Sequence, residues 1–126
     1  MYMDASALVK LMIAEAESEA VRSLVRAHPG QVSSLIVSIE VRRAAARAGV
    51  DEHVLDDTLD RVNLIPLDPF LALRAARLLP PSLRTLDAIH LSTALELGGE
   101  LDALVTYDRR LADAARGLGV RVESPS

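Results

Sequence analysis

The sequence predicts an α/β fold, in which a parallel sheet is covered by helices on both faces. Short apolar segments alternate with longer helical patterns along the chain, and this alternation is typical of a parallel sheet. Half of the residues are hydrophobic but only 2% are aromatic. The core must therefore be built from Leu, Val, Ile and Ala, which favours helices packed on a small sheet over an all-β sandwich. We expect a single domain over residues 1–126, because no linker, repeat or low-complexity tract interrupts the chain.

The expected strands are short and apolar. They are Met1–Met3, Gln31–Ser34, Asn63–Leu67, Ala103–Thr106 and Val120–Val122. Pro66 lacks the N–H group that a central strand needs, so the strand that contains it is expected at an edge of the sheet.

The expected helices have recognisable end signals. Ser6 is a plausible cap for the first helix, Gly49 suits the position after a helix end, and Pro69 suits a first turn. The helices are Ala5–Ala14, Glu17–His28, Ile36–Ala48, a segment from Asp51, a segment from Pro69 to Leu78, a segment from Leu83 to Gly98, and Arg109–Arg116.

The segment from Leu83 to Gly98 contains a contradiction at the helical period. Leu86 and Leu91 fall on a broad apolar arc and Ser92 falls opposite, yet Asp87 lies near the middle of the apolar arc. A carboxylate that points inward is costly unless a cation or a hydrogen-bond donor pairs with it. Thr85 could cap this helix and would place Asp87 in the first turn, where the helix dipole favours a negative charge. Asp87 is therefore either a structural residue near a helix start or part of a site.

Charge and composition exclude several classes of protein. The net charge is −4, so the chain is not broadly basic, and the absence of cysteine excludes disulfides and thiolate metal sites. Lys10 is the only lysine; the arginine bias accompanies GC-rich coding or serves phosphate recognition. No signal peptide is evident and no apolar stretch is long enough to span a bilayer, which predicts a soluble, cytoplasmic protein.

Two further acids follow expected strands, and a fourth lies within a helix. Asp4 and Asp108 come at the carboxyl ends of strands, where ligands bind in open parallel sheets. Each of them could instead be only a helix N-cap. Glu40 lies at the border of an apolar helical stripe, where a surface salt bridge to Arg43 is the simpler interpretation.

Together Asp4, Glu40, Asp87 and Asp108 suggest one site. Converging carboxylates without cysteine are a ligand set for a hard cation, Mg²⁺ or Mn²⁺. Two unit charges about 5 Å apart repel by about 3 kcal/mol at an effective dielectric constant near 20. Such a cluster is unfavourable for stability, so it indicates a function or a bound ion.

The segments around these acids resemble the motifs of PIN-domain ribonucleases, especially the VapC toxins of type II toxin–antitoxin pairs. The segments are Met3–Lys10, Ser38–Val41, Leu83–Leu91 and Val105–Leu111. The third, Leu-Arg-Thr-Leu-Asp-Ala-Ile-His-Leu, is the most specific, and the match spans nearly the whole chain in order. Ala5 stands where the family often has threonine.

The resemblance implies a PIN-like three-layer sandwich, with a parallel five-stranded sheet flanked by helices. It implies that the four acids hold one or two Mg²⁺ or Mn²⁺ ions, and that Ser6 and Thr106 support the site. The implied partners are an RNA substrate, a small VapB-type antitoxin and a second copy of the chain.

The expected reaction is metal-dependent hydrolysis of an RNA phosphodiester bond, in which an ion lowers the pKa of a bound water and neutralises the phosphate. The three aspartates are the first choices for direct ligands, and Glu40 binds through water or orients the nucleophile. Arg43, Arg84 and Arg109 are candidates for phosphate contacts, although each could be a solvated surface residue. His90 invites a role as general base, but we favour a core histidine with local hydrogen bonds, because the metal already supplies a nucleophile.

Other functions remain alternatives. The same fold could be a housekeeping PIN nuclease or a catalytically weak PIN domain that binds RNA or a protein, although the presence of all four acids argues against a weak domain. A phosphatase or phospho-receiver would need a second acid near Asp4 or a suitably placed lysine, and Lys10 lies in the wrong helix. No glycine-rich phosphate loop is present, so a nucleotide-binding module is not expected.

Overall fold

The computed structural model describes residues 1–126 and contains the expected parallel sheet. All strand pairs are parallel, and the strand order is β3-β2-β1-β4-β5. The strands are β1 (Tyr2–Met3), β2 (Gln31–Ser34), β3 (Val62–Ile65), β4 (Leu104–Val105) and β5 (Val122–Glu123). The short β1 lies at the centre, with Tyr2 paired to both Val32 and Leu104. Residues from both ends of the chain therefore meet beside β1.

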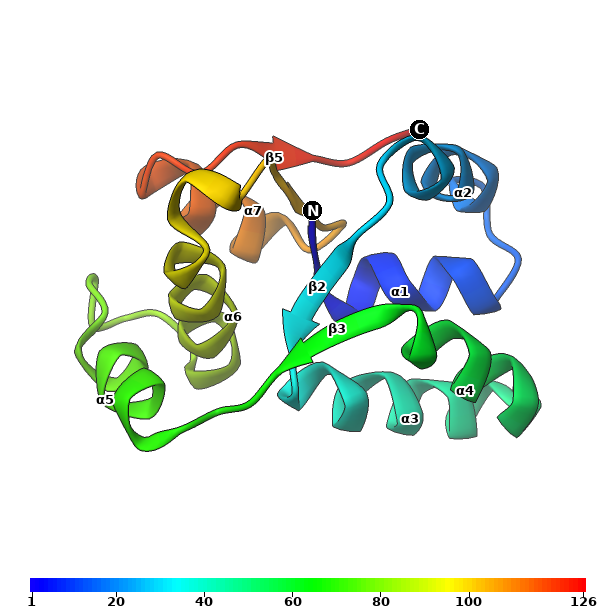
Figure 1. Ribbon diagram of the computed structural model, residues 1–126, viewed down its shortest axis with the longest axis horizontal. Helices are drawn as coiled ribbons and strands as arrows, with labels where there is room; N and C mark the ends of the chain where they lie inside the picture. Colours follow the sequence, from blue (N-terminus) through cyan, green and yellow to red (C-terminus); the bar gives the residue numbers. More distant parts are fainter.

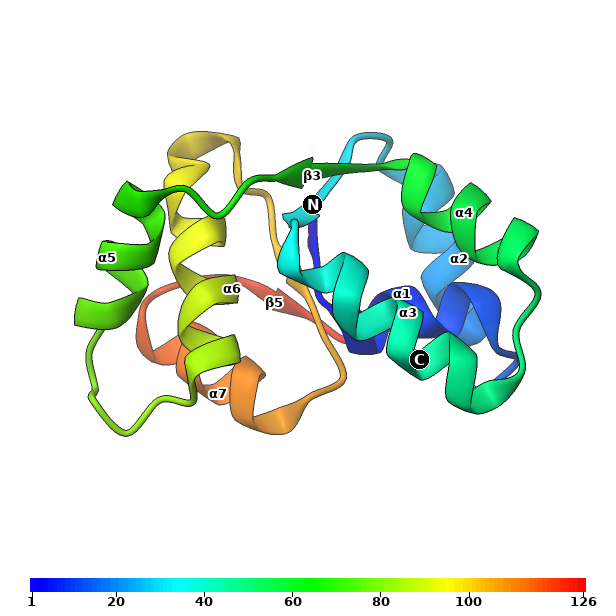
Figure 2. The same cartoon turned by 90° about the horizontal axis from the view of Figure 1, so that it is seen from below.

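The helices form two layers around this sheet (Figure 1). They are α1 (Ala5–Met12), α2 (Ser18–Ala27), α3 (Ile36–Ala48), α4 (Glu52–Asp60), α5 (Pro69–Arg77), α6 (Thr85–Glu96) and α7 (Arg109–Gly117). Figures 1 and 2 show α1 to α4 on one side of the sheet and α5 to α7 on the other. The expected three-layer sandwich is confirmed.

The two layers have separate cores because neighbouring residues of a strand point to opposite faces. Met3 and Val105 pack in a core with residues of α1, α3 and α4. Tyr2 and Leu104, one residue earlier in each strand, pack in a second core with Leu91 of α6 and residues of α7. All four strand residues are fully buried. Because side chains alternate between the two faces of a strand, the side chain of Tyr2, with its hydroxyl, points towards the layer that contains α6.

The order of the strands creates a place for a site. The chain passes from β1 outwards to β2 and β3, and then returns to β4 on the opposite side of β1. The strand order therefore reverses between β1 and β4, and in open parallel sheets such a point opens a crevice at the carboxyl ends of the strands. Asp4 follows β1 directly, and Asp108 follows β4 at the start of α7.

Two expectations about helix caps were wrong. Asp4, not Ser6, is the N-cap of α1, and its carboxylate accepts a hydrogen bond from the backbone N–H of Ala7. Arg84 occupies the N-cap position of α6 without a side-chain cap bond, so Thr85 is not the cap. Gly49 ends α3 in the left-handed conformation (φ 69°), as expected of a residue without a Cβ atom.

The helix α6 differs from the amphipathic pattern that the sequence suggested. Asp87 is buried in the first turn, as expected, but Leu86 is 45% exposed and Ser92 is only 2% exposed. The reason is that α6 is enclosed on more than one side: Ala88 and Ile89 pack with Ala75 of α5, and Leu91 packs in the core beside the sheet. No helix of the structure combines the length and the apolar character needed to cross a bilayer.

Candidate active site

The four acids that the sequence singled out line one pocket of about 270 Å³, which we call the acidic pocket. Asp4 comes from the end of β1, Glu40 from α3, Asp87 from the first turn of α6 and Asp108 from the start of α7. The remaining lining residues are Arg84, Thr85, Leu86, His90 and Leu111. Segments from both helix layers thus meet at the carboxyl edge of the sheet, as the strand order predicts.

Asp4 is the most firmly held of the four carboxylates. Its Oδ1 accepts hydrogen bonds from Ser6 Oγ at 2.7 Å and from Ala7 N at 3.1 Å, and its Oδ2 accepts one from Thr106 Oγ1 at 2.7 Å. Ser6 Oγ in turn accepts a hydrogen bond from the backbone N–H of Tyr107 at 2.8 Å. Ser6 and Thr106 therefore hold the first acid and join it to the segment after β4.

Asp108 is tied to the same segment. Its backbone N–H donates to Thr106 Oγ1 at 3.0 Å, and its Oδ1 accepts a hydrogen bond from the backbone N–H of Arg110 at 2.9 Å. Asp108 is thus the N-cap of α7 and at the same time a lining residue of the acidic pocket, as Asp4 is for α1. The cap and the site interpretations, which the sequence presented as alternatives, hold together for both residues.

Asp87 has an unpaired buried oxygen. The residue is only 7% exposed, and its Oδ2 atom is shielded from solvent without any hydrogen-bond donor. Burial raises the pKa of Asp87 above its usual value, and the nearby charge of Asp108 raises it further. A buried carboxylate oxygen without a donor is unfavourable, and a cation in the pocket would supply the missing partner.

Glu40 pairs with His90 and not with Arg43, so the surface salt bridge suggested by the sequence was wrong. His90 Nε2 lies 2.6 Å from Glu40 Oε1, and His90 Nδ1 lies 2.6 Å from the hydroxyl of Tyr2. His90 is 2% exposed and Tyr2 is fully buried. Both ring nitrogens are occupied, which fits the expected core histidine, although its partners come from distant parts of the chain.

The donor set suits a hard cation. Burial raises the pKa of Asp4 as well, in opposition to the hydrogen bonds from Thr106 and Ser6. The acids of the pocket offer only oxygen ligands, and Asp87 Oδ2 lacks any other partner. As the side chains stand, no three of them are close enough together to hold a metal ion. Ligation by three carboxylates at once would therefore require side-chain rotation.

The three candidate arginines lie in different places. Arg84 lines the acidic pocket, and its charge lowers the pKa of Asp87, although burial outweighs this effect. Arg109 lines a neighbouring hollow beside Thr106 and Asp108, and Arg43 is an exposed residue of α3 that does not line the acidic pocket. Of the three, only Arg84 lines the acidic pocket itself.

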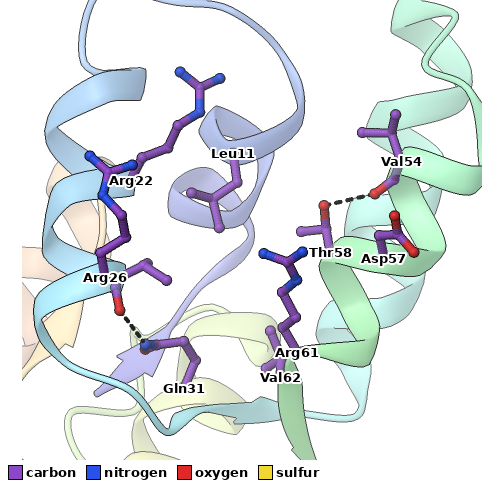
Figure 3. Close-up of a pocket in the computed structure, with 10 residues that line it drawn as sticks. Leu11, Arg22, Arg26, Gln31, Val54, Asp57, Thr58, Arg61 and Val62 are labelled. Atoms are coloured by element: carbon purple, nitrogen blue, oxygen red, sulfur yellow. Dashed lines mark hydrogen bonds between the residues drawn. The ribbon is translucent and has the colours of Figure 1, made fainter.

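A second pocket, of about 360 Å³, lies between α1, α2 and α4. We call it the arginine-lined pocket, after Arg22, Arg26 and Arg61, which line it together with Asp57. Figure 3 shows Arg22 and Arg26 on one side of the hollow and Arg61 on the other. None of the four acids of the candidate site lies in this pocket.

Comparisons with known proteins agree with this site and fold. A family model for the PIN domain matches residues 1–117. The chain is 44% identical to Ribonuclease VapC46 of Mycobacterium tuberculosis, over 99% of this chain and 97% of that protein. It is 39% identical to Ribonuclease VapC47 of the same species, over 98% of this chain and 96% of that protein. The chain therefore belongs to the PIN-domain family, and within it to the VapC ribonucleases.

Two solved structures share the fold. A chain of a toxin–antitoxin complex from Klebsiella pneumoniae superposes with a TM-score of 0.77 at 25% identity, over 99% of this chain and 97% of that chain. Mycobacterium tuberculosis VapC20, described as a sarcin–ricin loop cleaving toxin, superposes with a TM-score of 0.72 at 15% identity, over 90% and 93% of the two chains. The second likeness concerns the fold alone.

Sequence reasoning missed Tyr2 as a residue of the site region. Tyr2 was expected only as part of a strand, yet its hydroxyl is bound to His90 and accepts a hydrogen bond from Ser34 N at 3.1 Å. A polar aromatic side chain in the central strand of a chain with almost no aromatic residues was the available signal, since a buried tyrosine hydroxyl usually needs a partner.

Proposed function

We propose that this VapC ribonuclease hydrolyses RNA phosphodiester bonds in the acidic pocket, with Mg²⁺ or Mn²⁺ held directly by Asp4, Asp87 and Asp108 and through a bound water by Glu40. The observation that carries the proposal is the convergence of all four acids on one pocket, where Asp87 Oδ2 is buried without a donor. A divalent ion in such a site supplies an activated water near neutral pH and offsets the charge of the phosphate.

The side chains of the pocket divide the work. Thr106 and Ser6 hold Asp4 in place, so that its carboxylate faces the pocket in one orientation. Asp87 contributes an oxygen that no protein donor occupies. Glu40 is hydrogen-bonded through Oε1 only, and its Oε2 is available to accept a proton or to orient the attacking water. Arg84 contacts the phosphate from the rim of the pocket.

The biological role follows from the family. As a VapC ribonuclease, the protein is the toxin of a toxin–antitoxin pair, and its partner is a small VapB-type antitoxin. We infer that it acts in the cytoplasm, where RNA substrates of this class occur. All four acids are present and share a pocket, which supports an active nuclease over a catalytically weak binding domain.

We also infer a homodimer. Three large apolar side chains around α5 are strongly exposed: Phe70 at 83%, Leu79 at 67% and Leu73 at 48%. An exposed apolar patch of this kind is typical of a protein interface. A change of Phe70 to aspartate should shift the protein towards the monomer in light scattering, and an unchanged mass would contradict the assignment of this patch.

The decisive experiment is RNA cleavage by the purified chain, freed of any antitoxin. Structured RNA should be cleaved in the presence of Mg²⁺ or Mn²⁺, and a chelator should stop the reaction. Cleavage that continues without divalent ions would refute the metal-dependent mechanism. Sequencing of the new RNA ends would identify the substrate, and arrest of growth on expression, relieved by a neighbouring antitoxin gene, would test the toxin role.

A further inference from the structure

A chain of buried hydrogen bonds runs from the centre of the sheet to Glu40. The backbone N–H of Ser34 donates to the Tyr2 hydroxyl at 3.1 Å, the hydroxyl lies 2.6 Å from His90 Nδ1, and His90 Nε2 lies 2.6 Å from Glu40 Oε1. The residues belong to β2, β1, α6 and α3 in turn. The chain of bonds therefore connects the α6 layer to the α3 layer at the edge of the sheet where the acids converge.

The hydrogen bonds determine which nitrogen of His90 carries a proton. A carboxylate can only accept, so the short contact with Glu40 requires a hydrogen on Nε2. The Tyr2 hydroxyl already accepts from Ser34 N–H, and it has one hydrogen of its own to donate to Nδ1. With the Tyr2 hydrogen donated to Nδ1, the tautomer that carries its hydrogen on Nε2 matches every donor and acceptor of this chain of bonds.

We propose that Tyr2 and His90 are positioning residues that act through Glu40. His90 Nε2–H holds Oε1 of Glu40, and the Tyr2 hydroxyl holds the ring in the tautomer that makes this possible. Glu40 lines the acidic pocket, and its Oε2, which makes no hydrogen bond with the protein, is thereby left free for the substrate side of the reaction. This inference rests on the proposed function, because it takes Glu40 to be a working residue of the site.

The different burial of Tyr2, His90 and Glu40 explains why this positioning is effective. Tyr2 is fully buried and His90 is 2% exposed, whereas the side chain of Glu40 is 24% exposed. A partly exposed glutamate on a helix surface can adopt many rotamers, and a hydrogen bond from a rigid buried group selects among them. The rigid end of the chain of bonds lies in the central strand and the adjustable end lies at the pocket.

The same geometry argues against His90 as a general base. Nε2 carries a hydrogen and faces Glu40, and Nδ1 faces a tyrosine hydroxyl in the core, so neither nitrogen has a free lone pair directed at the pocket. His90 lines the acidic pocket but acts on the substrate only through the carboxylate that it holds.

A double-mutant cycle with the full-length protein tests the proposal. In the protein with Glu40 unchanged, His90→Leu should lower both kcat and the affinity for Mn²⁺ by about 10–100-fold, the usual effect of losing a group that orients a ligand. The affinity for Mn²⁺ is measured by calorimetry without RNA. His90→Gln keeps an amide donor and should recover part of the loss. In the Glu40→Gln background, the change at His90 should have almost no further effect on either quantity.

Tyr2→Phe supplies a milder variant, which keeps the ring that fills the core. Nitrogen-15 NMR of the imidazole should show His90 protonated on Nε2 alone in the unaltered protein, and a mixture of tautomers in Tyr2→Phe. Ser92→Ala is the matched control, since it also removes a buried hydroxyl, one that makes no hydrogen bond. It should change neither the tautomer nor kcat.

The outcomes separate this proposal from the proposed function. If Glu40→Gln leaves cleavage unchanged, the role of Glu40 and this inference both fall. If Glu40→Gln impairs cleavage but His90→Leu and Glu40→Gln have independent, multiplicative effects, the site stands and the positioning role is wrong. A proton on His90 Nδ1 instead of Nε2 in the unaltered protein would also overturn the proposal.

Discussion

The acidic pocket and the arginine-lined pocket hold opposite charges in very different environments. Asp4 and Asp87 are only 5% and 7% exposed, whereas the side chains of Arg22 and Arg26 are 38% and 64% exposed. Both arginines pair with Glu19 of the same helix, at 3.6 Å and 2.7 Å. The aspartates have no cationic side chain within salt-bridge distance and are held instead by hydroxyl and backbone donors, or by no donor at Asp87 Oδ2.

This difference shows that the fold places its unfavourable electrostatic interactions in the acidic pocket. Exposed arginines are solvated, and surface ion pairs of this kind contribute about 0–1 kcal/mol each. The acids lie where strand ends and helix starts converge, so burial raises the pKa of both Asp4 and Asp87, and the charges of Asp108 and Glu40 raise the pKa of Asp87 further. A cluster of carboxylates that the protein does not neutralise by itself is typical of a functional site.

The largest expected difference between the two pockets concerns catalysis. Asp4→Asn should lower the rate of RNA cleavage by a factor on the order of 10³ or more, because a ligand charge is lost while asparagine still caps α1. Arg61→Ala in the arginine-lined pocket should leave the rate unchanged. Initial rates with saturating Mg²⁺ measure both variants, and circular dichroism checks that each one is folded. Equal losses in the two variants would contradict the assignment of the active site.

A smaller effect is expected from the residue that holds Asp4. Thr106→Val keeps the shape of a fully buried side chain but removes the hydrogen bond to Asp4 Oδ2 and the acceptor for Asp108 N–H. Loss of a buried hydrogen bond to a charged group costs about 1.5–3 kcal/mol, so we expect a fall in kcat of roughly 10–100-fold. Thr58→Val is a control beside the arginine-lined pocket, where the hydroxyl only bonds to a backbone carbonyl of its own helix. Normal kcat in Thr106→Val would show that Asp4 is held adequately without it.

The acidic pocket should also be a site of instability in the absence of metal. Asp87→Asn removes a buried charge and should raise the melting temperature by a few degrees, roughly 4 °C for each kcal/mol gained, while it abolishes cleavage. Differential scanning calorimetry in a chelating buffer measures this shift. An unfolded variant would mean that Asp87 is a structural residue of α6.

The pH dependence of this gain has a defined sign. The pKa of Asp87 is higher in the folded state than in the unfolded chain, so the folded state binds more protons in the window above the usual value of about 3.9. Stability from this group is therefore lost as the pH rises through that window. The advantage of Asp87→Asn should be small below about pH 4 and should grow as the pH increases; a constant advantage would exclude titration of Asp87 as its cause.

The smallest expected effect is a change in KM that distinguishes Arg84 from Arg43. Arg84→Ala at the rim of the acidic pocket should raise KM several-fold, with a difference that shrinks at high salt, because a phosphate contact is screened by ions. Arg43→Ala on α3 is exposed in the same way but does not line the pocket, and its KM should stay unchanged. Equal changes in both variants would point to a general effect of charge.

Much of the architecture was predictable from local patterns. The bounds of β2 and α3 agree with the expected Gln31–Ser34 and Ile36–Ala48. The signals for both elements lie within one short segment: the polar residues of the strand, the alanine-rich helix and the glycine at position 49 that ends it. The edge position expected for the strand near Pro66 is confirmed, although β3 is Val62–Ile65 and ends before Pro66 instead of containing it. The four acids could be grouped because carboxyl ends of parallel strands meet at one edge of a sheet.

The sequence by itself determined the type of fold, the family and the identity of the acids, since these depend on periodicity and on residues that are close in the chain. Only the tertiary structure decided that Leu86 is exposed and Ser92 is buried, that Arg84 and not Arg43 lines the pocket, and that Glu40 pairs with His90. The bond between Tyr2 and His90 joins residues 88 positions apart, and that between His90 and Glu40 joins residues 50 positions apart. Helical and strand periods state which way a side chain points, but the packing of whole layers determines what it meets there.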